Sequence, residues 1–175
     1  ALLQYVKDTQ RKALPHLTGL RIQQQQDYIV VDAVSRNNLE IDQAIDGNKK
    51  VCLTGVIDHT KTAMGARCLR RWLGQPSLNF EVIQQRYQAI DDLIQHQLYP
   101  ELMSRFSRIS DIERIRARIA IQTARPRDLS ALRDSLAVLP ELIELCQAVA
   151  PGRIQQLASD LLPPAALTAL LTQAI

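Results

Sequence analysis

The feature that most constrains the fold is an apolar seam toward the C-terminal end of the sequence. Its members recur at alternating steps of three and four: Leu129, Leu132, Leu136, Leu139, Ile143 and Cys146. This heptad spacing puts all six on one side of an α-helix and predicts a long helix packed on a near-antiparallel neighbour. Pro126 suits the first turn of that helix, and Pro140 inside it predicts a kink.

The composition extends the helical prediction to the rest of the chain. Leu, Ala, Gln and Arg, all good helix formers, occur 25, 19, 18 and 16 times among the 175 residues. Aromatic residues make up only 4%, and there are only 6 Gly, which argues against an all-β sandwich or barrel. The length fits one domain, and no stretch approaches the roughly 18 uninterrupted apolar residues of a membrane span. We therefore expect no membrane partner.

Three helices are predicted between residues 33 and 98. Asp32 suits an N-cap, with a helix from Ala33 to about Ile45. Thr62 caps a second helix that ends before Pro76, and Gly65 within it predicts the close approach of another backbone. The third runs from Phe80 to Leu98, and its predicted inward positions are Ile83, Tyr87, Ile90, Ile94 and Leu98.

Shorter helices are predicted around the seam. Pro100 starts one, with Leu102, Phe106 and Ile109 turned inward. The segment Ser110–Glu113, with a cap residue and two acids, starts the next, which continues through Ile112, Ile115 and Ile119. Two more helices, at residues 153–162 and 165–175, are separated by Pro163 and Pro164.

Residues 1–31 show patterns different from those of the helical segments that follow. Residues 1–14 resemble the end of a helix closed by Pro15, and we interpret this apolar start as a cut from a longer protein without a secretion signal. Runs of β-branched and aromatic residues at 20–22 and 28–31 favour a short two-stranded ribbon. The predicted fold class is therefore mainly α, a multihelical array with a small two-stranded β ribbon near residues 20–31.

The usual signatures of catalysis and metal binding do not occur. The histidines His16, His59 and His96 each stand alone, and the spacings from Cys52 to His59 and on to Cys68 match no common zinc pattern. Neither a glycine-rich phosphate loop nor a Gly-x-Ser-x-Gly elbow is found. We therefore predict no catalytic, cofactor-binding or metal-binding residue in this chain.

Two other groups of reactive side chains favour structural interpretations. The adjacent acids Asp91 and Asp92 point about 100° apart on a helix and favour a solvated face over an acid–base pair. The three cysteines, Cys52, Cys68 and Cys146, are far apart and odd in number. They favour buried free thiols in a reducing compartment.

Arginines are concentrated in residues 105–134, where eight Arg face four acids. One interpretation is a stripe that meets nucleic-acid phosphates. The other, which we favour, is an exposed helical face with local ion pairs, such as Asp128 with Arg125 or Arg127. No aromatic residues are interleaved with these arginines, and the net charge of the chain is only +3. The group Arg67, Arg70 and Arg71 allows the same two interpretations.

A specific motif begins at Thr62, with the spacing Thr-x-Met-Gly-x-Arg-x-Leu-x-x-Trp-Leu. It lies within one of six notable stretches: Asp27–Asp32, Arg36–Ile41, Ile57–Pro76, Arg86–Leu93, Asp111–Ile115 and Ala124–Leu129. In this order and spacing, the stretches resemble the core, or lever, domain of the MutS family of DNA mismatch repair proteins. Two departures from the family pattern are Cys68, in place of a larger apolar residue, and residues 76–79, in place of the commoner Pro-Leu-x-Asp.

The resemblance implies a part of a bacterial, cytoplasmic, dimeric ATPase that clamps mispaired double-stranded DNA and works with a MutL-type partner. The mismatch-reading Phe-x-Glu motif and the Walker ATPase, with its ATP and Mg, belong to other domains, so this segment is not itself an enzyme and needs no cofactor. Residues 1–175 would be the first segment of the core domain. Its expected parts are the end of a connector-to-core helix at 1–14, the ribbon at 20–31, a helical core at 33–124 and lever-like helices at 126–175 that lead to the clamp.

Two functional hypotheses follow. The first is that this segment links the DNA clamp to the ATPase domain and transmits conformational change, with the Leu129–Cys146 helix as the lever. That assignment fails if the segment is several short turns or a buried hub helix. The alternative is a stand-alone helical module that binds nucleic acid or protein through its Arg-rich faces.

Overall fold

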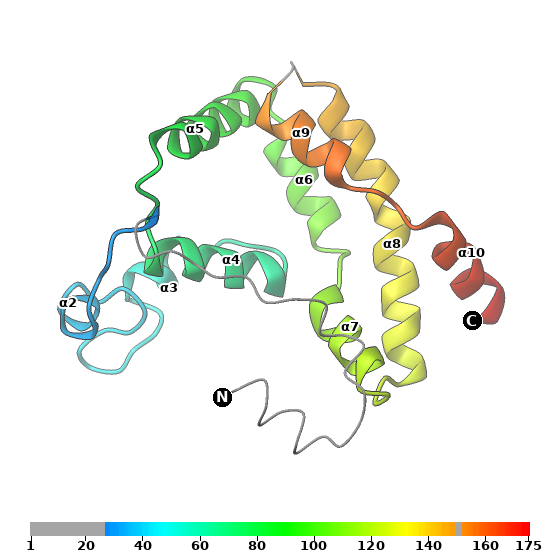
Figure 1. The fold of residues 1–175 in the computed structure, drawn as a ribbon, viewed down its shortest axis with the longest axis horizontal. Coiled ribbons are helices and arrows are strands. Elements are labelled where there is room, and N and C mark those ends of the chain that lie inside the picture. Colours follow the sequence, from blue (N-terminus) through cyan, green and yellow to red (C-terminus); the bar gives the residue numbers. More distant parts are fainter. Residues whose placement is uncertain (1–26, 150–151) are drawn as a thin grey trace.

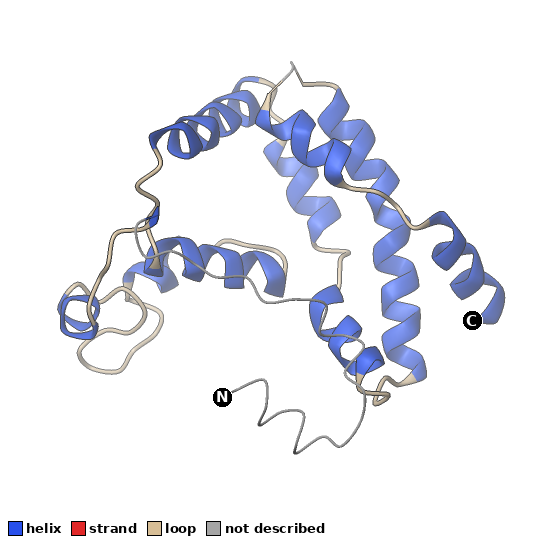
Figure 2. Cartoon of the chain, viewed as in Figure 1, coloured by secondary structure: helices blue, strands red, loops and turns tan. Residues whose placement is uncertain are grey.

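The computed structural model describes residues 27–149 and 152–175, and in this part the chain is mainly helical, as predicted (Figures 1 and 2). The helices of this part are α2 (Ala33–Asn38), α3 (Leu53–Ile57), α4 (Ala63–Gly74), α5 (Phe80–Gln95), α6 (Tyr99–Phe106), α7 (Ile112–Ala120), α8 (Pro126–Gln147), α9 (Arg153–Asp160) and α10 (Ala165–Ala174). None of the helices within the described ranges is both long and apolar enough to cross a membrane.

The helix starts follow the capping chemistry of the sequence. The Asp32 carboxylate accepts hydrogen bonds from the backbone N–H groups of Val34 and Ser35, and the Thr62 hydroxyl accepts one from Gly65. The Asp111 carboxylate caps α7 in the same way. Because the first-turn N–H groups have no partner inside the helix, these side chains determine where each helix begins.

The predicted helix from Ala33 to about Ile45 is wrong in its length, because α2 ends at Asn38. Glu40 takes a left-handed backbone conformation with φ of 48°. The carbonyl groups of Glu40 and Ile41 accept hydrogen bonds from the backbone of Leu53 and Thr54. These bonds to the start of α3 replace the bonds that would have continued the helix, and they bury Ile41.

The predicted ribbon lies largely outside the described residues, as does the predicted helix at 1–14. Of the second predicted strand, Tyr28 forms an isolated antiparallel bridge with Ser77. The neighbouring hydrogen bonds join Ile29 to Pro76 and Leu78 to Asp27. The segment before α2 is therefore held against the turn between α4 and α5.

The seam helix is present as α8, a single helix of 22 residues that continues through Pro140. It is buried on two sides, whereas the heptad seam predicted one. Leu132 and Leu136 pack with Ile115 of α7 and Leu171 of α10. Val138 and Leu142, which lie outside the seam, pack with Leu102 of α6. The helices α6, α7, α9 and α10 all contact α8, which is therefore the packing centre of the C-terminal half (Figure 1).

The inward face predicted for the third helix is correct only in part. Ile83 and Leu98 are half-buried, and Leu98 packs against the cluster of Leu102, Val138 and Leu142. On α5, Tyr87, Ile90 and Ile94 are 65%, 50% and 60% exposed, and we call these three residues the α5 stripe. The covered side instead carries Leu93, which packs against the α6–α8 core, and the buried Asp92. Helix α9 contacts α5 on the described part of the chain. The spacing identified an amphipathic helix correctly but not the side that this structure covers.

The close backbone approach expected at Gly65 occurs elsewhere. A Cβ atom at Gly65 would meet only the side chains of Thr62 and Thr60, at 3.0 and 3.3 Å. At Gly55 of α3, however, a Cβ atom would lie 2.1 Å from the carbonyl oxygen of Lys49. The turn at residues 49–50 therefore passes so close to α3 that only glycine fits at position 55.

Candidate functional site

The Arg-rich segment is mostly neutralised by acids in the structure. Five of its arginines form ion pairs: Arg105 with Glu101 and Glu141, Arg108 with Glu141, Arg114 with Asp111, Arg118 with Asp128, and Arg133 with Asp134. Three of the six pairs are local in sequence, those of Arg105 with Glu101, Arg114 with Asp111 and Arg133 with Asp134. The other three join separate elements: Arg105 of α6 and Arg108 of the loop after it pair with Glu141 of α8, and Arg118 of α7 pairs with Asp128 of α8. Ion pairs therefore neutralise most of this charge, half of them local in sequence and half between elements.

The partner expected for Asp128 was also wrong. Its carboxylate accepts two hydrogen bonds from the Arg118 guanidinium, at 2.8 and 3.0 Å, and one from the backbone N–H of Arg125. These bonds hold the pKa of Asp128 below its ordinary value, with the Arg125 N–H contributing most. Asp128 thus closes the turn from α7 to α8.

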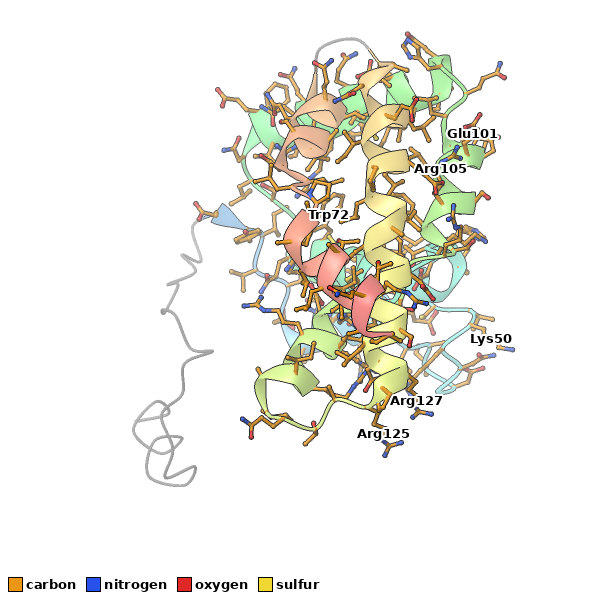
Figure 3. All side chains as sticks on the ribbon, turned by 90° about the vertical axis from the view of Figure 1, so that its right-hand side faces the viewer. Lys50, Trp72, Glu101, Arg105, Arg125 and Arg127 are labelled. Carbon is orange, nitrogen blue, oxygen red and sulfur yellow. The ribbon has the colours of Figure 1, made fainter. Side chains whose placement is uncertain are left out.

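Three arginines of the segment, Arg116, Arg125 and Arg127, form no ion pair within the described residues. All three are exposed. Figure 3 shows Arg125 and Arg127 at the start of α8, pointing away from the helices. They are the part of the segment that remains open to an anionic partner.

The most elaborate polar arrangement in the structure centres on Arg67 of α4. Its guanidinium donates two hydrogen bonds to the two carboxylate oxygens of Asp111, at 2.7 and 2.8 Å. Two more bonds go to the Oε2 atom of Glu113, at 2.6 and 3.1 Å. Both acids lie at the start of α7, where α4 and α7 approach each other (Figure 1). We call this set of three residues the Arg67 fork.

The electrostatics of the fork follow from its geometry. A planar guanidinium matches a carboxylate with two parallel hydrogen bonds, which are stronger than bonds between neutral groups. The Arg67 guanidinium lowers the pKa of Asp111, and the two acids raise the pKa of Arg67. Asp111 also accepts the backbone N–H of Arg114, so one carboxylate caps α7 and binds α4. Arg67 and Asp111 therefore stay charged through the neutral pH range.

The other arginines of α4 have different surroundings. The Nη2 atom of Arg70 lies 3.6 Å from the Oδ2 atom of Asp58, and the Arg71 guanidinium donates a hydrogen bond to the Sγ atom of Cys68. Arg86 of α5 stacks on the ring of Trp72, with its guanidinium carbon 3.7 Å from the ring centroid. Sequence spacing missed this contact of an arginine with an aromatic ring, because the two residues belong to different helices.

The histidines and cysteines bring no metal site together in the described part of the chain. Cys52 is buried, accepts the Gly55 N–H at the start of α3 and donates to the Lys49 carbonyl. Cys68 and Cys146 are half-buried free thiols, and burial raises the pKa of Cys146. His96 contacts the backbone carbonyl of Asp92. His16 lies outside the described residues.

The adjacent acids do not form the solvated face that was expected. Asp91 is exposed, but Asp92 is only 7% exposed and accepts a hydrogen bond from the Gln88 amide. The prediction was wrong because the covered side of α5 is the side that carries Asp92. A polar cavity of about 460 Å³, near α3 and α4, is also absent from the sequence-based predictions. Its lining includes Asp42, Lys49, Asp58 and Arg70, acids and bases mixed, and no single ligand chemistry follows from it.

A comparison with protein-family models agrees with the resemblance seen in the sequence. The model of MutS domain III matches residues 34–175, which includes all nine of the described helices except the first residue of α2. The Arg67 fork and the α8 core both lie inside the matched region. The chain therefore belongs to the MutS family of DNA mismatch repair proteins and carries that family's domain III.

Proposed function

We propose that this chain is part of a mismatch-recognition ATPase and transmits conformational change between its DNA clamp and its ATPase domain. The observation that carries the proposal is the packing of α6, α7, α9 and α10 on one helix, α8. A densely packed body moves as a unit, because its core cannot deform gradually. In this proposal the segment has no catalytic site and no cofactor of its own, and ATP and Mg bind to another domain.

The lever that we propose differs from the hypothesis drawn from the sequence, in which the Leu129–Cys146 helix alone was the lever. That hypothesis required one long helix, which α8 is, but it excluded a buried hub. With helices packed along two of its sides, α8 is such a hub. We therefore assign transmission to the α8 bundle, defined as α6 to α10, and not to α8 as a free-standing lever.

The proposed partners are the remaining domains of the same chain. The α5 stripe is an exposed apolar surface along one helix, and it supports docking of the second core segment of the parent protein. Mispaired double-stranded DNA, a MutL-type protein and a second copy of the parent are proposed partners of the whole protein. The proposed location is the bacterial cytoplasm.

The proposal is tested by loosening the α8 bundle in the full-length protein. Leu142 of α8 is only 3% exposed, whereas Leu162, before α10, is 81% exposed, so Leu162→Ala is a matched control for Leu142→Ala. The readout is the factor by which ATP weakens binding to mismatched DNA, measured below the unfolding temperature of both variants. We expect Leu142→Ala to reduce this factor while each ligand alone still binds.

Two outcomes would contradict transmission through the α8 bundle. An ATP effect that stays at its full size in Leu142→Ala, although that variant is measurably less stable, contradicts transmission through the bundle. An equal loss in Leu162→Ala also contradicts it, because that substitution leaves the buried core intact.

The alternative function, a module that itself binds nucleic acid, is favoured by one observation: Arg116, Arg125 and Arg127 are exposed and form no ion pair within the described residues. Titration of the 175-residue chain with duplex DNA at two salt concentrations separates the two proposals. Tight binding that falls steeply with salt supports the module, since each phosphate contact releases counterions. Weak binding with a shallow salt dependence supports the connecting role.

A further inference from the structure

The Arg67 fork joins two parts of the molecule that are far apart in sequence. Arg67 belongs to α4, and its acidic partners stand 44 and 46 residues later, at the start of α7. Helix α7 in turn packs on α8, where Ile112 and Ile115 contact the cluster that contains Leu132 and Leu136. The contacts therefore run from α4 through the Arg67 fork to α7, and from α7 to α8 at the centre of the α8 bundle.

The chemistry of the fork restricts which side chain can occupy position 67. Four hydrogen bonds leave three different nitrogen atoms of one guanidinium, and they end on two carboxylates. Lysine carries the same charge but is a point donor without the planar geometry that reaches both acids at once. The side chain of Asp111 is 18% exposed and that of Arg67 35%, so solvent screens the fork only in part.

We propose that Arg67 is a positioning residue that holds α4 against α7 and passes displacements of α4 to the α8 bundle. The inference rests on the proposed function, because it names the joint through which the bundle is moved. Asp111 is central to this role, since the same carboxylate caps α7 and receives the fork. A shift of α4 therefore acts on the first turn of α7 directly.

The test compares conservative variants at position 67 with the same variants at a control position. Arg153 at the start of α9 lies outside the Arg-rich segment and forms no ion pair in the described residues, so Arg153→Lys and Arg153→Gln are matched controls for Arg67→Lys and Arg67→Gln. The first readout is amide hydrogen exchange of α4 and of the first turn of α7 in the full-length protein. We expect exchange there to rise roughly two- to fivefold in both Arg67 variants, and not in the controls.

The second readout is the ATP effect on mismatch binding in the same four variants. Faster exchange together with a reduced ATP effect supports the inference. Unchanged exchange in Arg67→Lys overturns it, because the geometry of the fork is then not needed. Faster exchange with a full ATP effect also overturns it, because the joint then carries no coupling, and the result for Leu142→Ala shows separately whether the bundle transmits.

Discussion

At the scale of single residues, a few contacts determine where the backbone can run. Gly55 is the strictest position, since its place in α3 is crossed by the turn at residues 49–50. Gly65 lies in the first turn of α4, where the Thr62 hydroxyl accepts its backbone N–H, and the atoms nearest to a Cβ there belong to side chains. We therefore expect the same substitution to cost more at Gly55 than at Gly65.

We expect Gly55→Ala to lower the free energy of unfolding by roughly 1–3 kcal/mol, because the new Cβ atom forces the Lys49 carbonyl away. Gly65→Ala brings its Cβ atom against the side chains of Thr62 and Thr60 at 3.0 and 3.3 Å, and should cost less than Gly55→Ala. Urea unfolding followed by circular dichroism measures both. Equal losses in the two variants would contradict this account of Gly55.

Asp128 gives the fold a defined response to acid. Its pKa is lowered in the folded chain, so its contribution to stability is complete above the ordinary pKa of an aspartate. That contribution declines as the pH falls toward the lowered value and is lost below it. The stability advantage of the native chain over Asp128→Asn should therefore shrink on acidification, as followed by urea unfolding at a series of pH values. A constant difference from neutral to acidic pH would show that the ionised carboxylate is not what matters.

At the scale of elements, the helices differ in how strongly packing fixes them. Substitution of Leu142 by alanine removes a buried side chain from the α8 core and should cost roughly 2–5 kcal/mol in unfolding free energy. Ile90→Ser, in the exposed α5 stripe, should change the stability of the 175-residue chain by less than about 0.5 kcal/mol. Thermal and urea unfolding of both variants test the contrast, and a large loss in Ile90→Ser would show that the stripe is covered in this chain.

Local signals in the sequence predicted where helices begin better than they predicted which neighbours each helix contacts. Cap residues such as Asp32 and Thr62 identified helix starts, because a cap acts within three residues of the backbone that it binds. The end of α2 was missed, because it depends on bonds to Leu53 and Thr54 more than ten residues away. The covered side of α5 was missed as well, since periodicity shows that one side is apolar but not which neighbour covers it.

The contacts of the Arg67 fork could be predicted from the sequence even less well than the helices. The sequence indicated that the charge of Arg67 needed an explanation, but its acids follow more than 40 residues later on another helix. The contact of Trp72 with Arg86 likewise forms between helices. Only the packing of α4, α5 and α7 brings these side chains together, and no spacing rule within a single helix contains that information.

At the scale of the whole molecule, the described residues contain a packed body, the α8 bundle, to which the Arg67 fork ties α4. The α5 stripe and the unpaired arginines at the start of α8 face outward. This arrangement suits a part that passes motion between other domains.

The central claim, that the α8 bundle moves as one body, is tested most directly by distances between spin labels in the full-length protein. Ser104 of α6 and Glu144 of α8 are both exposed, so labels there report on the interior geometry of the bundle. A second pair joins Glu144 to the ATPase domain. We predict that ATP changes the second distance and leaves the first unchanged. A changed distance between positions 104 and 144, with a constant distance to the ATPase domain, would contradict the account.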